Sequence, residues 1–83
     1  MKRSRTEVII AILKAAKEEA CKTRLMYTVN MNLASFNKYL RELTERGLIA
    51  IVNDSPDKMM YKTTERGKNL LQLLEEAEKF VSL

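Results

Sequence analysis

The 83-residue sequence contains no histidine and no tryptophan, and it has only one cysteine, one proline and two glycines. Without histidine the chain lacks the commonest general base and the commonest metal ligand in proteins. Cys21 alone excludes a disulfide within the chain and favours a reducing compartment. Two glycines do not make a glycine-rich phosphate-binding loop. We therefore expect a protein that is not an enzyme and that uses no cofactor and no metal.

Long hydrophobic runs are also missing. The run from Val8 to Leu13 is six residues long, whereas a membrane span needs about 18 or more apolar residues. Lys14 and Lys17 follow it directly, which argues against a secretory signal. We expect a cytoplasmic protein with no membrane partner, associated with the nucleoid if it binds DNA.

Charge is what the sequence has in excess, and it is unevenly placed. The net charge is +4, which suits a polyanionic partner. Residues 1–62 hold 12 Lys/Arg against 7 Asp/Glu, a balance of +5, and residues 63–83 hold 3 against 4, a balance of −1. The length allows one domain, residues 1–83, with a small core. We expect a binding surface in the basic part and an assembly role for the last segment.

Residues 22–47 have the pattern of a helix-turn-helix. A short first helix is expected to begin at Thr23, whose hydroxyl can accept an exposed backbone N–H. A second helix is expected from its cap, Asn32, to the residue before Gly47, which can end a helix in the left-handed conformation. Its apolar residues recur at steps of three, four and three: Leu33, Phe36, Leu40 and Leu43. This spacing indicates an amphipathic helix, and two helices joined by about four residues form a helix-turn-helix.

Before this motif the sequence predicts a basic arm, a helix and a very short strand. Residues 1–5 form the arm, the helix is expected over Arg5–Glu19 with Ser4 or Thr6 near its cap, and the strand over Cys21–Thr23. The helix has two apolar faces, one of Ile9, Leu13, Ala16 and Ala20 and one of Val8, Ile12 and Ala15. Because a small core needs only one face, we expect the second to contact another subunit.

Residues 48–63 predict a β-hairpin. Leu48–Val52 is rich in β-branched residues, and Met59–Thr63 is the second expected strand. Between them, Asn53–Lys58 is dense in turn-forming residues, and Pro56 cannot donate to a sheet ladder. The expected product is a hairpin with a polar tip.

Residues 64–83 predict a closing helix that serves dimerisation. Thr64 is expected to cap it, and Gly67 lies in its first turn, where glycine permits close backbone packing. Four of its apolar residues form a seam of heptad type: Leu70, Leu74, Ala77 and Val81. Three others stand beside that seam: Leu71, Leu73 and Phe80. Two apolar faces exceed what a monomer needs, although a last helix folded fully onto its own domain is the alternative. The expected dimer interface comprises Val8, Ile12, Leu70, Leu73, Leu74, Ala77, Phe80 and Val81.

Two stretches of the sequence resemble parts of a winged helix. Residues Leu40 to Ile49 resemble the end of the recognition helix and the entry to the wing. The exit from the wing is resembled by Tyr61-Lys62-Thr63-Thr64-Glu65-Arg66-Gly67. With the basic start, the Thr23–Tyr27 run and the lone last helix, the chain is similar to small archaeal winged-helix DNA-binding proteins of the ArnR-like kind. The resemblance implies a mainly α fold with a small β-hairpin (α+β), a winged helix-turn-helix with an additional C-terminal helix. It also implies double-stranded DNA binding, usually as a homodimer joined through the terminal helices. Relatives commonly carry a larger apolar residue in place of Thr63, so we expect the second wing strand to be less well anchored here.

The exposed side of the Asn32–Arg46 helix carries residues suited to DNA. Its N-terminal half, the part of a recognition helix that enters the major groove, holds no acidic residue, and Glu42 and Glu45 fall in the far half. Asparagine pairs with adenine and alanine meets the thymine methyl, whereas Lys38 and Arg41 suit phosphates or guanine. The expected DNA contacts are Lys22, Thr23, Arg24, Ala34, Ser35, Asn37, Lys38, Arg41 and Lys58. The alternative is a solvated helix face without a DNA contact.

Three functions are compatible with these features. The first is a sequence-specific, homodimeric DNA-binding transcription regulator. The second is an architectural protein that coats duplex DNA with little sequence preference, through phosphate contacts. The third is a protein-interaction module, because a fold does not fix a function. No pocket for a small-molecule effector can be identified from the sequence.

Overall fold

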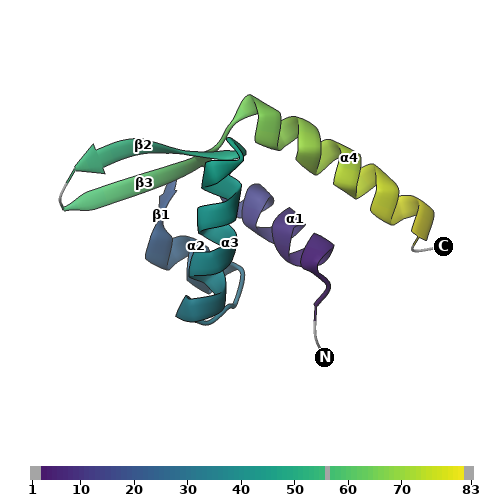
Figure 1. Ribbon diagram of the computed structural model, residues 1–83, viewed down its shortest axis with the longest axis horizontal. Helices are drawn as coiled ribbons and strands as arrows, with labels where there is room; N and C mark the ends of the chain where they lie inside the picture. The colour runs from purple at the N-terminus through teal and green to yellow at the C-terminus, as the bar shows by residue number, and fades with distance from the viewer. Residues whose placement is uncertain (1–2, 56, 82–83) are drawn as a thin grey trace.

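The computed structural model describes residues 3–55 and 57–81, and within them it has four helices and a three-stranded antiparallel sheet (Figure 1). Met1 and Lys2 of the basic arm, Pro56 of the hairpin tip and residues 82–83 of the closing helix lie outside the described residues. The elements are α1 (Arg5–Ala15), β1 (Ala20–Cys21), α2 (Lys22–Thr28), α3 (Leu33–Glu45), β2 (Ile49–Ser55), β3 (Lys58–Thr63) and α4 (Glu65–Val81). This confirms the predicted fold class, a winged helix-turn-helix with an additional C-terminal helix.

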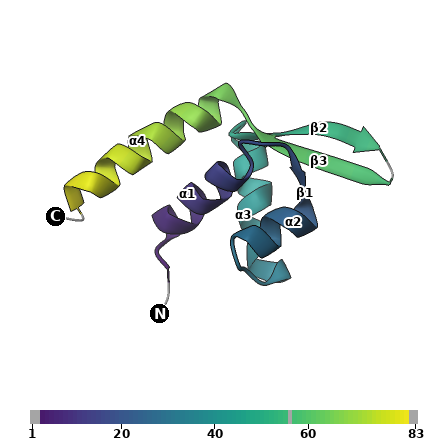
Figure 2. The same ribbon diagram turned by 180° about the vertical axis from the view of Figure 1, so that it is seen from behind.

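The molecule is elongated, with extents of 45 × 29 × 19 Å. In Figures 1 and 2, α3 stands near the middle, the β2–β3 hairpin (the wing) reaches out on one side and α4 on the other. The core lies where the first three helices, the inner ends of the strands and the start of α4 meet. Its buried hydrophobic residues are Val8, Ile12, Leu13, Ala16, Ala20, Leu25, Val29, Phe36, Leu40, Leu43, Leu48, Ile49, Tyr61 and Leu71.

Helix α1 begins as predicted and ends earlier than predicted. Ser4 caps it in a capping box, because its Oγ accepts from the Glu7 N–H at 3.1 Å and Glu7 Oε1 accepts from the Ser4 N–H at 3.3 Å. The predicted end at Glu19 is wrong. The carbonyl of Ala16, which a longer helix would use internally, accepts instead from the Thr63 N–H at 2.8 Å. This bond to β3 allows the chain to turn into β1.

Two residues assigned to the dimer interface belong to the core of the chain itself. Val8 and Ile12 are 6% and 0% exposed. They are covered because α1 packs against both α2 and α4, so the expectation that they are available to a second subunit is wrong.

The described part of the basic arm is held against the domain. The Arg3 guanidinium donates to the carbonyl of Val29, at the end of α2. Arg5 is already the first residue of α1, pairs with Glu42 on α3 and lies with its guanidinium carbon 5.6 Å from the centre of the Tyr39 ring. Arg3 and Arg5 therefore fix α1 to the helix-turn-helix.

The short strand and the start of α2 are displaced from their predicted positions. β1 pairs with β3 through Ala20 opposite Tyr61 and Cys21 opposite Met60, so it precedes the predicted Cys21–Thr23. Cys21 is the N-cap of α2 and makes no side-chain cap bond. The prediction that Thr23 caps this helix is therefore wrong, because the pairing with β3 ends at Cys21 and the next residue is already helical.

The turn between α2 and α3 depends on one asparagine. Asn30 has φ +55°, a left-handed conformation that asparagine tolerates better than most residues. Its N–H bonds the Tyr27 carbonyl at 3.1 Å, and the Met31 N–H bonds the Met26 carbonyl at 3.2 Å. These are the two bonds of a Schellman motif. The turn therefore stops α2 sharply and sets the direction in which α3 leaves.

Both predicted ends of α3 are confirmed. Asn32 Oδ1 accepts from the Ser35 N–H at 2.9 Å at the start, and Gly47 has φ +73° after the last turn. Leu33, which the spacing assigned to the buried stripe, is 55% exposed. As the first residue of α3 it lies beyond the region that the core covers, so that assignment is wrong.

The wing is longer than predicted and is firmly anchored at its base. β2 continues through Asn53 to Ser55, so most of the predicted tip is strand, and the register shifts between Ile51 and Asn53. Thr63 is 3% exposed, and its Oγ1 donates to the Leu13 carbonyl at 2.7 Å. The predicted weaker anchoring is wrong, because the Thr63 hydroxyl makes a buried hydrogen bond that a larger apolar residue lacks.

Helix α4 is fixed to the domain at its start. The prediction that Thr64 caps it is confirmed, since Thr64 Oγ1 accepts from the Gly67 N–H at 3.0 Å and donates to the Gly47 carbonyl at 2.7 Å. At Gly67 a Cβ would lie 2.1 Å from the Leu48 carbonyl oxygen. Farther along, Leu71 is 1% exposed and Glu75 lies 3.5 Å from the Lys14 ammonium on α1. The last two turns of α4 contribute no buried residue.

Candidate nucleic-acid interface

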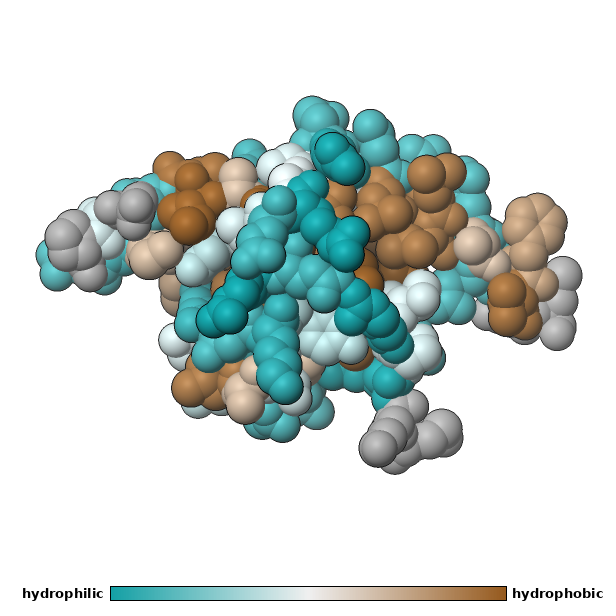
Figure 3. All heavy atoms as spheres, viewed as in Figure 1, coloured by the Kyte–Doolittle hydropathy of each residue, from teal (hydrophilic) through white to brown (hydrophobic). Residues whose placement is uncertain are grey.

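Helix α3 presents its polar side to solvent because its apolar side is buried. Phe36, Leu40 and Leu43 are 0%, 4% and 2% exposed, and burying such a side chain contributes about 1.5–3 kcal/mol. Lys38 and Arg41 are exposed on the other side, and hydrophilic side chains cover this front of α3 in Figure 3. Packing of the core therefore fixes which residues of α3 a partner can reach.

Three of the predicted DNA contacts meet in a hollow between α3 and the wing. Lys22, Asn37 and Arg41 line a cavity of about 350 Å³. The remaining lining residues come from α3 and from the two wing strands: Leu40, Thr44, Glu45, Ile51 and Tyr61. Two cations face one carboxylate in this hollow, so it has the charge that a phosphate backbone requires.

A second hollow follows the exposed side of α3. It has a volume of about 570 Å³ and is lined by Lys38, Arg41, Glu42, Glu45 and Arg46. Glu42 forms ion pairs with Arg5 and with Arg46, whose Nε lies 3.5 Å from Oε1 of Glu42. Lys38 and Arg41 form no ion pair with another residue in the part of the chain that the structure describes. Their charges are therefore not neutralised within the fold.

Glu45 lines both hollows, so acidic charge is confined to the C-terminal half of α3 but is not remote from Arg41. The N-terminal half carries none. A polyanion would therefore meet its least repulsion at the beginning of α3.

The other predicted contacts are accessible but do not join these hollows. Thr23 and Arg24 are exposed on α2, Ala34 is exposed and Ser35 half-buried in the first turn of α3, and Lys58 is exposed at the outer end of the wing. The predicted set therefore extends along the helix-turn-helix and onto the wing, with Lys22, Asn37 and Arg41 as the part that lies together.

Two residues outside the predicted contact set also lie exposed on the helix-turn-helix, and the sequence had left open whether one of them, Tyr27, is a core residue or a DNA contact. Tyr27 is 75% exposed on α2, and Leu33 is 55% exposed at the start of α3. An apolar side chain beside Ala34 can meet a thymine methyl in the major groove. The available signal was the position of Leu33 at the very first turn of its helix, ahead of the buried stripe.

Neither a metal centre nor a membrane span is found within the described residues. No group of three or more His, Cys, Asp and Glu side chains among residues 3–55 and 57–81 has the arrangement to hold a metal ion. Over the same residues, no helix combines the length and apolar character needed to cross a bilayer.

Known proteins share this architecture. The sequence model described as winged helix-turn-helix matches residues 2–82. An uncharacterized protein of the archaeon Methanocaldococcus jannaschii is 41% identical over 76 residues, which cover 90% of this chain and 73% of that protein. Sso10a-2, a DNA-binding protein from Sulfolobus solfataricus, has a crystal structure that matches with a TM-score of 0.88 and 30% identity, over 96% of this chain and 83% of that one.

A padr family transcriptional regulator from Eggerthella lenta has the same fold, with a TM-score of 0.77 and 20% identity over 94% of this chain and 73% of that one. The chain belongs to the winged helix-turn-helix family, has archaeal relatives and adopts the fold of DNA-binding transcription regulators.

Proposed function

We propose that the chain is a double-stranded DNA-binding transcription regulator that acts as a homodimer and has no catalytic activity. The observation that carries the proposal is the outward side of α3, where Lys38 and Arg41 stand exposed without an ion pair to any described residue. Cations left unneutralised on a recognition helix suit phosphates. Sso10a-2, at 30% identity, is described as a DNA-binding protein, which supports DNA as the partner.

The contacts divide by chemistry. Lys22, Thr23, Arg24 and Lys58 are proposed to position the protein on the phosphate backbone, because cations and hydroxyls contact phosphates without reading sequence. Ala34, Ser35 and Asn37 lie in the half of α3 that enters the major groove and are proposed to read base edges. Lys38 and Arg41 are proposed to contact phosphates or guanine. The protein would then work in the cytoplasm, on the nucleoid.

The proposed dimer is joined through the exposed side of α4. Leu73, Phe80 and Val81 are 64%, 81% and 80% exposed, and Ala77 is also exposed. Monomeric soluble proteins seldom leave so many apolar side chains in water on one element. Leu70 and Leu74 are half-buried beside them and complete the proposed interface. Pairing of two α4 helices would join two recognition helices in one particle, as a two-fold operator requires.

An architectural role on DNA is the second candidate. Sso10a-2 is described as a DNA-binding protein, whereas the regulator from Eggerthella lenta is only 20% identical and supports the fold alone. An architectural protein would bind through phosphates and show a small specificity ratio.

Two measurements test these proposals. The chain is first titrated with mixed-sequence duplex at several salt concentrations. The logarithm of the binding constant should fall linearly with the logarithm of the salt concentration. Selection from a random duplex pool should return a motif, because a mismatch at a contacted base pair typically costs about 1–3 kcal/mol. A selection that returns no motif would favour the architectural role. If the chain does not bind duplex DNA even at low salt, both the regulator and the architectural role are overturned.

A further inference from the structure

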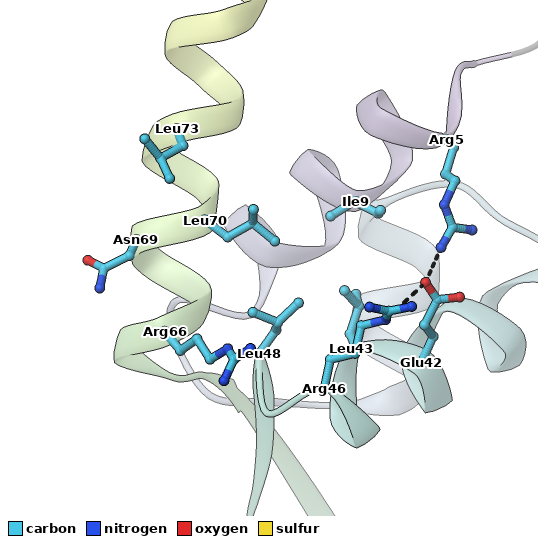
Figure 4. A pocket seen from close by; sticks show the side chains of 10 residues that line it. All are labelled: Arg5, Ile9, Glu42, Leu43, Arg46, Leu48, Arg66, Asn69, Leu70 and Leu73. Carbon is cyan, nitrogen blue, oxygen red and sulfur yellow. Dashed lines mark hydrogen bonds and ion pairs between the residues drawn. The ribbon is translucent and has the colours of Figure 1, made fainter.

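A third hollow lies between α1, the C-terminal end of α3 and the first half of α4, and it adjoins the second hollow, with which it shares Glu42 and Arg46. Its volume is about 510 Å³, within the range of about 300–1,000 Å³ typical of small-molecule sites. The apolar residues that line it are Ile9, Leu43, Leu48, Leu70 and Leu73. In Figure 4 the side chains of Ile9, Leu43, Leu48 and Leu70 converge on its interior, and in Figure 3 hydrophobic side chains gather between α1 and α4.

The rim of this hollow carries three guanidinium groups and one carboxylate. Arg5 and Arg46 both contact Glu42, with 3.5 Å between the Arg46 Nε and Oε1 of Glu42. Arg66 lines the opposite wall, on α4, and makes no hydrogen bond or ion pair with another described residue (Figure 4). The hollow therefore combines an apolar floor with an excess of two positive charges.

We propose that this hollow binds a small amphipathic anion, with an apolar body on the leucine floor and a carboxylate or sulfonate on Arg66. Guanidinium groups favour such oxyanions because they offer several N–H donors in a planar fork. A second copy of the chain is the competing occupant, since Leu70 and Leu73 also belong to the proposed dimer surface. An apolar side chain of that copy would leave the excess positive charge of the hollow unneutralised, whereas an amphipathic anion matches both the apolar floor and the charge. This inference goes beyond DNA binding and does not depend on it.

The test uses two fluorescent probes that share an apolar body. 8-Anilinonaphthalene-1-sulfonate carries a sulfonate, and N-phenyl-1-naphthylamine lacks it. The full chain should bind the sulfonate more tightly. Arg66→Gln should weaken sulfonate binding by about two- to fivefold, the range for an exposed charge pair, and should leave the neutral probe unchanged.

Glu42→Gln provides the opposite change, because it removes the one carboxylate among the described residues that line the hollow. It should tighten sulfonate binding by about two- to fivefold, because it removes one repulsive charge of the same partly exposed kind. Lys17→Gln, which removes an exposed charge outside this hollow, is the matched control and should have no effect. If Arg66→Gln alters the fold by circular dichroism, Arg46→Gln replaces it, with a smaller expected weakening because Arg46 is already paired with Glu42.

Three outcomes would overturn the proposal. They are equal binding of the two probes, equal effects of Arg66→Gln and Lys17→Gln, and sulfonate binding that strengthens when the protein is diluted from dimer to monomer. The last outcome would assign the hollow to the second copy of the chain. DNA titration of the same variants is a separate readout, so failure here leaves the proposed function standing or falling on its own test.

Discussion

Helices α3 and α4 have the same kind of apolar spacing, yet the fold treats them in opposite ways. The apolar stripe of α3 is buried, and its polar side remains outside. In α4 only Gly67 and Leu71 are buried, while Leu73 and Phe80 are 64% and 81% exposed. The side that remains outside indicates the kind of partner: a polar, basic side suits a polyanion, and an apolar side suits another protein.

The exposed apolar side of α4 follows from the length of the helix against which α4 packs. α4 has 17 residues and α1 has 11, which correspond to about 26 Å and about 16 Å at 1.5 Å per residue. The start of α4 is covered by the domain, but its last turns extend past α1, as Figures 1 and 2 show. The apolar stripe of α4 therefore continues beyond the core and stays exposed there.

The largest contrast is expected when a charge is placed in each stripe. Leu40→Glu on α3 puts a carboxylate at a position that is 4% exposed and should unfold the domain, with a loss above about 4 kcal/mol. Phe80→Glu on α4, at a position that is 81% exposed in the single chain, should leave the fold intact. It should raise the dissociation constant of the proposed dimer at least about tenfold, because a buried unpaired carboxylate costs more than about 1.4 kcal/mol. Circular dichroism and sedimentation velocity measure the two effects. A folded Leu40→Glu variant, or a Phe80→Glu variant that sediments as the parent does, would remove the contrast.

The attachment of α4 can be tested at its glycine. In Gly67→Ala the new Cβ would meet the Leu48 carbonyl oxygen at 2.1 Å and Thr63 Cγ2 at 2.6 Å, and overpacking against backbone should cost about 3 kcal/mol. Gly47→Ala is the matched control, since its Cβ has open space and only the φ of +73° is unfavourable, for about 1 kcal/mol. Urea unfolding compares them. Equal losses would mean that α4 is not fixed by close packing at Gly67.

A smaller effect is expected at the turn that sets the direction of α3. Asn30→Ala keeps the left-handed φ of +55° with a residue that tolerates it poorly, and should lower the free energy of unfolding by about 1 kcal/mol. Asn30→Gly should cost less than the alanine variant, because glycine adopts this conformation readily. The order of the two melting temperatures decides the point, and a more stable alanine variant would contradict it.

Local chemistry made much of this fold predictable from the sequence. The caps at Ser4, Asn32 and Thr64 and the stop at Gly47 depend on residues within a few positions of one another, so their spacing was sufficient. Thr63 was misjudged because its partner, the Leu13 carbonyl, is 50 residues away. A contact of that kind exists only after the strand and the first helix have been brought together.

The candidate sites were predictable to a lesser extent for the same reason. The exposed cations of α3 follow from its helical period, and Lys38 and Arg41 are where that period puts them. The apolar faces of the first helix gave no sign of which neighbours would cover them, so Val8 was assigned to an interface. The hollow lined by Arg5, Arg46 and Arg66 joins residues from three helical regions, and no motif in the sequence connects them.

The claim that the outward side of α3 binds DNA is tested most directly by a charge-matched comparison of salt dependence. Two double variants are compared. One combines Lys38→Ala with Arg41→Ala on α3, and the control combines Lys17→Ala with Lys79→Ala. Each removes two exposed cations, so the two variants have the same net charge. Mixed-sequence duplex is titrated with parent and variants at several salt concentrations. For the α3 variant the affinity should fall, and the log–log slope should decrease by about one unit for each lost phosphate contact, while the control keeps the parent's slope. Identical slopes for both variants would contradict the account.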